Sequence, residues 1–230
     1  MTRARGGGEI LMTNQSRDNT KRVLNVYERF APRYDQTVRF WERVLGLDEG
    51  RRWVASQARG DVLEMAIGTG RNLAYYPTAV RLTGVDLSPS MLKRARRRVR
   101  DLGRDADLRV DDAQALDLPD EAFDTVVITL SLCSIPDERR ALAGALRVLR
   151  PGGRLFLLEH VRSPARLIRA GQRLLAPLIL WLQADHLMRD PLEHLESVGF
   201  VVERVERSRW GIVERVAARK PLSGRLPPHS

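Results

Sequence analysis

The sequence has few residues of the kinds that form disulfides or bind metals. It contains a single cysteine, Cys133, among 230 residues, and its four histidines have no cysteine partner at ligand spacing. A lone cysteine excludes an internal disulfide, and the histidine spacing gives no zinc pattern. We therefore predict a protein with no metal centre, in a reducing, cytoplasmic setting.

Long apolar runs are also lacking. The longest, from Leu174 to Leu182, has nine residues and contains Pro177, whereas a membrane-spanning helix needs about 20. The first residues contain no apolar stretch of the kind that a secretory signal requires. We expect a flexible tail over residues 1–16, no transmembrane helix, and a disordered tail over residues 221–230.

Lysine is rare, and most of the positive charge comes from arginine. The chain has 39 basic and 29 acidic residues, a net charge of +10. The densest basic stretch, Lys93 to Arg100, keeps Ala95 and Val99 at helical spacing, which favours the solvated outer face of an amphipathic helix over contact with an anionic membrane or with nucleic acid. Base-stacking aromatic residues are missing there, so a nucleic-acid-binding module is disfavoured.

From residue 61 onward, short apolar segments alternate with helical ones, a pattern typical of a parallel α/β sheet. The predicted strands are 62–67, 82–85, 108–110, 123–130, 154–159, 200–207 and 210–219. The predicted helices after the first strand are 71–76, 88–102, 137–149, 164–184 and 191–198. Two further helices, separated by Pro32, are expected before residue 58. We predict one domain over residues 17–220, divided into a helical cap (17–58), a cofactor-binding core (61–160) and a substrate-side insertion (161–199).

The sharpest motif is a strand that runs into a glycine turn between residues 62 and 73. Small residues at 66, 68 and 70 let a ligand lie against bare backbone, and ligands of open parallel sheets bind at the carboxyl ends of strands. The dinucleotide fingerprint fails, because Leu73 stands at its third glycine position. Glu64 is also unsuited to a pyrophosphate but suits a cation.

Acidic residues end the next two predicted strands. Asp86 lies 18 residues after Gly68, and a carboxylate there can accept hydrogen bonds from both hydroxyls of a ribose. Asp111 and Asp112 follow the third strand, and one of them can accept from an adenine amine. The predicted ligand is an adenosine without phosphates but with a positive centre.

On these residues, the sequence resembles the class I S-adenosylmethionine-dependent methyltransferases, in particular the group of quinone, thiol and phospholipid methyltransferases. The resemblance covers about residues 26–219. It rests on the Glu64 to Gly70 loop, Asp86, the Asp112-Ala113 pair, Phe123-Asp124, and the segment 147–153. It implies a Rossmann-like, seven-stranded, mostly parallel sheet with the last strand antiparallel, helices on both faces and an N-terminal helical cap. It also implies S-adenosylmethionine as the methyl donor.

The resemblance implies a role for several residues. Gly68 and Gly70 contact the methionyl end of the cofactor, Asp86 the ribose, and Asp112 with Ala113 the adenine. An aromatic cap residue, Tyr34, either covers the sulfonium, where cation–π attraction is favourable, or simply packs in the helix turn. The complete predicted cofactor set is Tyr34, Glu64, Ala66, Gly68, Gly70, Asn72, Asp86, Leu87, Met91, Asp112, Ala113 and Thr129. Ala66 departs from the family, which usually has glycine there.

Methyl transfer requires alignment of the reactants and exclusion of water, and a protonated acceptor also needs a base. His160, beside Glu159 at the end of the fifth predicted strand, is the predicted catalytic base, with a structural, hydrogen-bonded histidine as the alternative. The pair Asp185-His186 is a second candidate. Cys133 is interpreted as a packing residue.

The stretch from Arg166 to Leu182 is the best indication of the acceptor. Arg166, Arg169 and Arg173 share a helical face before the apolar run, so the segment is a pocket lid, an interfacial membrane helix or core. We expect a small or lipid-like apolar acceptor, such as a quinol, thiol, amine or phospholipid headgroup, with peripheral membrane contact as an alternative arrangement. RNA methylation and an adenosine-cofactor oxidoreductase are the alternative functions. The sequence does not predict the oligomeric state.

Overall fold

The computed structural model of the chain describes residues 14–183, 189, 191–208 and 210–222, with side chains described from residue 17 except at 40–41 and 175–183. The helices are α1 (Asn14–Phe30), the 3₁₀ turn η1 (Ala31–Arg33), α2 (Tyr34–Leu45), α3 (Leu47–Ser56), α4 (Pro89–Asp101), α5 (Glu138–Val148), α6 (Arg166–Gln183) and α7 (Leu192–Val198). The strands are β1 (Asp61–Met65), β2 (Arg81–Asp86), β3 (Asp107–Val110), β4 (Phe123–Thr129), β5 (Leu149–His160), β6 (Val201–Ser208) and β7 (Val213–Arg219).

The strands form one sheet in the order β3-β2-β1-β4-β5-β7-β6. Strands β1 to β5 pair in parallel, whereas β7 runs antiparallel to both β5 and β6. The predicted Rossmann-like sheet with an antiparallel last strand is therefore confirmed. The chain moves outward from β1 to β3 and then returns to β4 on the other side of β1. The carboxyl ends of β1 and β4 consequently meet where the strand order reverses, which is where such sheets bind ligands.

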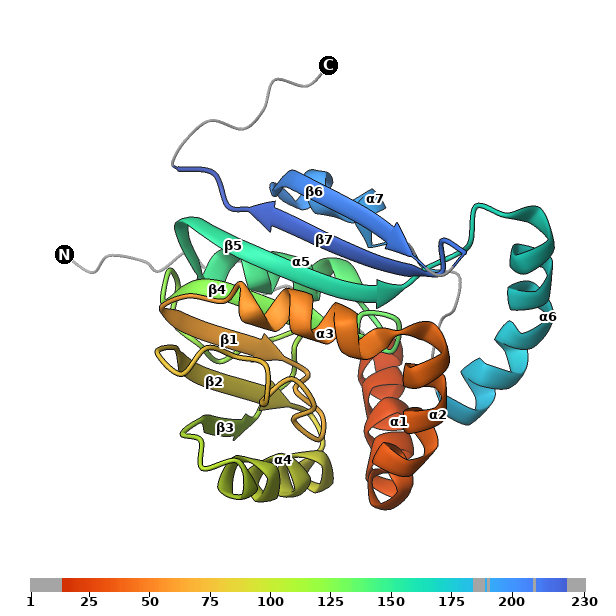
Figure 1. Cartoon of the computed structure of the whole chain (residues 1–230), viewed down its shortest axis with the longest axis horizontal. Coiled ribbons are helices and arrows are strands. Elements are labelled where there is room, and N and C mark those ends of the chain that lie inside the picture. The colour runs from red at the N-terminus through yellow and green to blue at the C-terminus, as the bar shows by residue number, and fades with distance from the viewer. Residues whose placement is uncertain (1–13, 184–188, 190, 209, 223–230) are drawn as a thin grey trace.

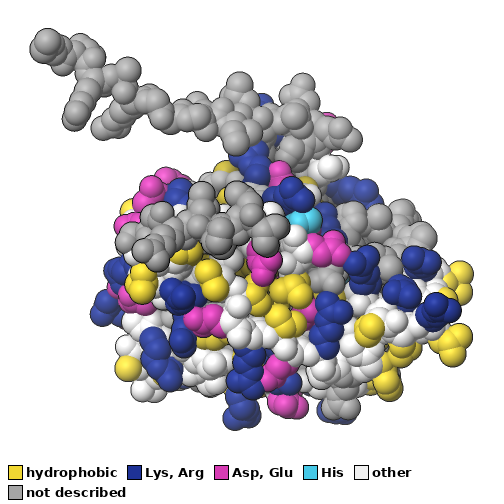
Figure 2. Space-filling model, turned by 90° about the horizontal axis from the view of Figure 1, so that it is seen from above, with side chains coloured by type: hydrophobic (Ala, Val, Ile, Leu, Met, Phe, Trp, Pro, Cys, Tyr) yellow, Lys and Arg dark blue, Asp and Glu magenta, His cyan; other side chains and the backbone are white. Residues whose placement is uncertain are grey.

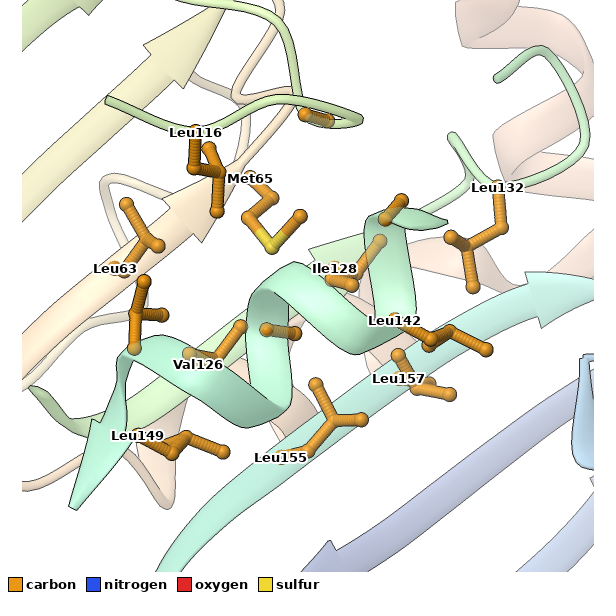
Figure 3. Packing of buried hydrophobic residues seen from close by; sticks show 14 of the residues in the cluster. Leu63, Met65, Leu116, Val126, Ile128, Leu132, Leu142, Leu149, Leu155 and Leu157 are labelled. Atoms are coloured by element: carbon orange, nitrogen blue, oxygen red, sulfur yellow. The ribbon is translucent and has the colours of Figure 1, made fainter. Parts of the chain in front are cut away.

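Alternate residues of the central strands supply two hydrophobic cores, one on each face of the sheet. In β1, Leu63 and Met65 belong to the core under α5, whereas Val62 belongs to the opposite one. Figure 3 shows α5 lying across β4 and β5, with Leu142 close to Ile128 and Leu157. Because successive strand residues point to opposite faces, these central strands are apolar on both faces and helices cover both.

The N-terminal cap has three helices, where the sequence predicted two. The expected break at Pro32 is the short turn η1, and a second break follows α2 at Gly46, whose φ of 64° lies in the left-handed region. Glycine adopts this conformation without a steric penalty. In Figure 1, α1 and α2 lie beyond the arrowheads of the parallel strands. The cap thus covers the edge of the sheet where a ligand is expected.

The predicted helix at 71–76 is wrong, because this segment forms a series of turns. The amide of Leu73 donates to the carbonyl of Gly70 over 3.1 Å, and Tyr75 donates to Asn72 over 2.8 Å. These bonds span three residues, whereas an α-helix requires four. The side chain of Asn72 points inward to β1 and β4, and Pro77 follows the turns. Packing against the sheet has replaced the helix.

The predicted helix at 164–184 is α6, which continues through Pro177. It packs against α1 and stands clear of the sheet in Figure 1. Among the described helices, none combines the length and the apolar character that crossing a bilayer needs. The side chains of 175–182, and the pair Asp185-His186, lie outside what the structure describes. The division of the chain into cap, core and insertion stays a prediction.

Candidate functional site

A cavity with about 870 Å³ of empty space, solvent at its mouth included, lies where the carboxyl ends of the strands meet the cap. Most of the predicted cofactor residues line it, namely Tyr34, Glu64, Ala66, Gly68, Asp86, Leu87, Met91, Asp112, Ala113 and Thr129. Gly70, Asn72 and His160 are not part of its wall. The structure therefore brings together side chains that are up to 95 positions apart in the sequence.

Two glycines of the turn after β1 have different roles. Gly68 has a φ of 58°, and a Cβ built on it meets no atom within 4 Å, so the position opens onto empty space in the cavity wall. Gly70 has a φ of 77°, and its Cβ would lie 2.5 Å from the side chain of Leu73. Gly68 therefore leaves room for a ligand, whereas Gly70 keeps the turn closed and packed.

Ala66 stands in a strained conformation. Its φ is 52°, and Leu130, which follows the neighbouring strand β4, has the same value. The left-handed region costs an L-residue roughly 1–2 kcal/mol. Both residues line the cavity, and strain of this kind gathers at functional sites. The glycine-to-alanine departure noted in the sequence thus falls where glycine is favoured.

Asp86 is fixed at the end of β2 by two backbone donors. The amide of Gly68 donates to its Oδ2 over 2.8 Å, and the amide of Ser88 donates to its Oδ1 over 2.8 Å. Burial raises the pKa of Asp86 to about 6, against the effect of these hydrogen bonds. A carboxylate has about four acceptor positions. Two are therefore left for a pair of ribose hydroxyls.

Glu64 is buried at the end of β1 among neutral donors. Asn72 Nδ2 donates to its Oε1 over 2.7 Å, and the Tyr76 hydroxyl donates to its Oε2 over 2.9 Å. Burial raises the pKa of Glu64 to about 7, although both hydrogen bonds and the charge of Arg51 oppose the rise. Asn72 also donates to Thr129 Oγ1 over 2.9 Å. Asn72 therefore positions two wall residues from behind.

Aromatic rings from the cap form another part of the wall. Tyr34 lies 6.5 Å from Tyr27 and 5.6 Å from Phe30 between ring centroids, and the second pair meets edge to face. Burial is the main cause that raises the pKa of Tyr34 to about 12, so its phenol stays neutral. Both tyrosines line the cavity. Neutral rings of this kind attract a cation such as a sulfonium.

Gln114 is a functional candidate that the sequence did not reveal. Its side-chain amide donates to Asp112 Oδ1 over 3.0 Å and to Thr20 Oγ1 over 3.2 Å, and its Oε1 accepts from the amide of Asp137 over 2.9 Å. Gln114 is buried and lines the cavity. It therefore fixes Asp112 and joins this loop to α1 and to the start of α5.

Three acidic residues of the cap hold it against the core, and the sequence predicted none of them. Two of them act through the arginines around the glycine turn. Asp35 Oδ2 accepts from Arg98 over 2.7 Å, and Glu42 pairs with Arg71 of the turn as well as with Arg51, which lies in α3 of the cap itself. Burial disfavours the charge of Asp35, but hydrogen bonds from Thr69 and Arg98 outweigh it and lower the pKa.

The third acid, Glu28, caps the start of α4. It accepts from Ser88 Oγ over 2.5 Å and from the amide of Ser90 over 3.0 Å. The hydrogen bond from Ser88 is the main cause that lowers the pKa of Glu28. Because Ser88 also donates to Asp86, the cap contacts the same turn that fixes the predicted ribose-binding carboxylate.

Of the two residues predicted at the end of β5, Glu159 holds the loop that follows β4. Glu159 is buried, and its Oε1 accepts from the amides of Ser131 and Leu132 over 2.9 and 3.0 Å. His160 pairs with Val213 in the β5–β7 ladder, and its role as a base stays a prediction. Cys133 is buried in this loop.

Comparisons with known proteins agree with this geometry. A family model described as a methyltransferase domain matches residues 63–157. A phosphatidylethanolamine N-methyltransferase of Cereibacter sphaeroides is 39% identical over 119 residues, which are 51% of this chain and 59% of that protein. The ubiquinone/menaquinone biosynthesis C-methyltransferase UbiE of Geobacter sulfurreducens is 31% identical over 163 residues, which cover 65% of this chain and 62% of that protein. The chain thus spans about three fifths of the length of these relatives.

The solved structures show the same fold. A crystal structure of an S-adenosylmethionine-dependent methyltransferase from Thermotoga maritima matches with a TM-score of 0.66 at 21% identity, and the match covers 86% of this chain and 99% of that one.

Sheet order, glycine turn and the methyltransferase-domain model that matches residues 63–157 agree with the class I S-adenosylmethionine-dependent methyltransferases, which the chain resembles. The residues present fit S-adenosylmethionine, because Gly68 leaves space at the turn, and Asp86 and Glu64, the predicted partners of a ribose and a cation, both line the cavity. Within that class, the chain resembles enzymes named for quinone and phospholipid acceptors.

Proposed function

We propose that the protein transfers a methyl group from S-adenosylmethionine to a small or lipid-like apolar acceptor, such as a quinol, thiol, amine or phospholipid headgroup. The composition of the cavity wall carries the proposal. Carboxylates from the strand ends line it together with apolar side chains of α1 and of the loop after β4, including Val23, Leu24 and Ile135. A wall of this kind suits a cationic cofactor beside an apolar acceptor. The two relatives described above are named for acceptors of these kinds.

Individual residues have distinct proposed roles. S-Adenosylmethionine supplies a methyl group already activated on a positive sulfur. Asp86 accepts the ribose hydroxyls, Asp112 with Ala113 holds the adenine, and the Tyr34 ring covers the sulfonium. The protein then needs to align the acceptor and exclude water. Helix α1 contributes to both, because its side chains close the wall over the strand ends. His160 is the proposed base for a protonated acceptor.

A methyl-transfer screen with a labelled donor tests this function directly. The panel contains a quinol, an alkyl thiol, phosphatidylethanolamine micelles and RNA. We expect transfer to at least one apolar acceptor. Asp86→Asn should weaken S-adenosylhomocysteine binding by about 10–100-fold, since hydrogen bonds to a charged group are worth about 1.5–3 kcal/mol. Transfer to RNA alone would refute the acceptor class. Tight binding of NADH with no binding of S-adenosylhomocysteine would refute the enzyme class.

We also infer that α6 contacts a lipid surface that bears negative charge. Leu167 and Leu174 are 89% and 81% exposed and stand seven residues apart, hence on one face of the helix. Arg166, Arg169 and Arg173 lie on an adjacent face of the helix, all to one side of the two leucines. Figure 2 shows hydrophobic and basic side chains side by side at the end of the molecule where α6 lies. Apolar and basic residues in this arrangement bind the interface of an anionic bilayer.

Sedimentation with vesicles tests the lipid contact. We expect binding to phosphatidylglycerol vesicles and weaker binding to phosphatidylcholine vesicles. Binding should decrease in 1 M salt, where the screening length falls to about 3 Å. The double variant Leu167→Ser, Leu174→Ser should lose the binding. Leu102→Ser, at the C-cap of the basic helix α4 and 42% exposed, is the matched control. Equal binding of the double variant and the wild type would exclude α6 as the contact.

A further inference from the structure

The loop after β4 is a single turn whose two ends are held by opposite charges. Within it, the amides of Ser134 and Ile135 donate to the carbonyl of Ser131 over 3.0 and 3.1 Å. At its amino end, the carboxylate of Glu159 accepts from the amides of Ser131 and Leu132. Free amides at the start of a turn favour a negative partner, and free carbonyls at its end favour a positive one.

The positive partner is Arg189, which lies in the segment between α6 and α7. Its Nη1 donates to the carbonyls of Leu132 and Ile135 over 2.7 and 2.5 Å, and its Nη2 donates to the carbonyl of Pro136 over 3.3 Å. The side chain is 20% exposed, and its Nε lies 3.7 Å from Glu138 Oε2. A guanidinium presents its donors in a rigid fork. One side chain can therefore fix three carbonyls of the turn at once.

This turn is part of the cavity wall after β4, and the residue that follows it, Asp137, donates from its amide to Gln114 over 2.9 Å. Ser134, Ile135 and Pro136 all line the cavity. The cofactor carboxylates have partners of their own: Asp86 is held by Gly68 and Ser88, and none of the bonds described for it involves Arg189. A change at Arg189 therefore acts on the wall of the turn and leaves the ribose contact in place.

We propose that Arg189 is a positioning residue for the methyl acceptor. It holds the turn from Ser131 to Pro136 in the shape that forms the acceptor's side of the cavity, with Glu159 holding the other end. Because Arg189 follows α6 in the chain, the segment that contacts lipid is joined to the acceptor site by a few residues of backbone. This inference rests on the proposed methyltransferase function.

The test compares Arg189→Gln, Arg189→Lys and the control Arg162→Gln. Arg162 pairs with Glu193 on α7 and donates no bond to the turn. The acceptor is whichever of octanethiol, decyl quinol and phosphatidylethanolamine micelles the wild type methylates fastest. We expect Arg189→Gln to raise the KM for this acceptor about tenfold or more, with S-adenosylhomocysteine affinity within about twofold of the wild type. Arg189→Lys should be intermediate, because an ammonium lacks the fork.

A second measurement separates this proposal from the proposed function. Hydrogen exchange of the Ser134 and Ile135 amides should be about tenfold faster in Arg189→Gln than in Arg162→Gln, while the Ile67 and Gly70 amides exchange as in the wild type. If no acceptor is methylated, the proposed function fails, and exchange alone decides whether Arg189 holds the turn. Unchanged exchange overturns the proposal. Faster exchange with an unchanged KM in an active enzyme overturns it as well, as does an equal loss of cofactor affinity.

Discussion

Replacing Glu64 with glutamine should remove a strong pH dependence from the stability of the ligand-free protein. Burial raises the pKa of Glu64 to about 7 in the folded state, whereas a glutamate in an unfolded chain titrates near 4.3. The folded protein therefore binds this proton more tightly than the unfolded chain does. The stabilising contribution is complete below about pH 4.3 and is lost as the pH rises through 7.

The size of the effect follows from the two pKa values. Each pH unit between them changes the free energy of unfolding by about 1.4 kcal/mol. Between pH 5 and pH 8, Glu64 alone should therefore lower the free energy of unfolding by about 2–3 kcal/mol. Asp86 acts in the same direction at lower pH, since burial raises its pKa to about 6. The wild-type profile alone does not isolate Glu64.

Urea unfolding of the wild type and Glu64→Gln at pH 5, 6, 7 and 8 isolates the effect. Glutamine keeps the shape and can still bond to Asn72 and Tyr76, but it does not titrate. Relative to the wild type, the variant should gain about 2–3 kcal/mol between pH 5 and pH 8. Glu193→Gln, at a carboxyl on α7 that pairs with Arg162 and lies outside the cavity wall, is the control for the loss of a carboxyl group. Parallel profiles for Glu64→Gln would refute the reasoning, because they would show that Glu64 titrates alike in both states.

Three further results are expected. Ala66→Gly should stabilise the ligand-free protein by about 1 kcal/mol, because the steric strain that glycine removes at this positive φ exceeds the conformational entropy that glycine adds to the unfolded chain. Thermal unfolding measures this stability, with Ala113→Gly as the control. His160→Ala should lower turnover by about 10²–10⁴-fold with unchanged S-adenosylhomocysteine affinity, whereas turnover within about threefold from pH 6 to 9 would make His160 structural. Asp35→Asn should destabilise the fold by about 1–3 kcal/mol in urea unfolding, because Arg98 and Thr69 lose a charged partner; no change would show that this contact contributes nothing.

The sheet and most of the cavity wall were predictable because their signals are local. Alternating apolar strands and a glycine turn occupy contiguous stretches, and the topology of a parallel sheet brings the strand ends together. The helix prediction for 71–76 was wrong for a physical reason, because the Asn72 side chain donates hydrogen bonds to Glu64 and Thr129 across the turn. The spacing of apolar residues within the segment does not indicate those partners, which lie 8 and 57 positions away.

The contacts between cap and core could not be predicted from the sequence for a related reason. Asp35 and Arg98 are 63 positions apart, and Glu28 and Ser90 are 62 apart. Charged residues at such separations look like surface residues in the sequence. Similarly, Gly68 and Gly70 belong to one motif, but only the backbone geometry shows that the first opens onto the cavity and the second packs against Leu73.

The cap has a consequence for how such an enzyme can diverge. The residues proposed to hold the donor lie mostly at the strand ends between 64 and 129, whereas Val23 and Leu24 reach the cavity from α1. Substitutions in α1 can therefore change the preference for an acceptor while the residues at the strand ends stay unchanged. What limits this change is the trio Glu28, Asp35 and Glu42, whose partners all lie outside α1 and α2. A cap with a changed preference for the acceptor therefore has to retain those three carboxylates, or supply equivalent contacts, in order to stay attached to the core.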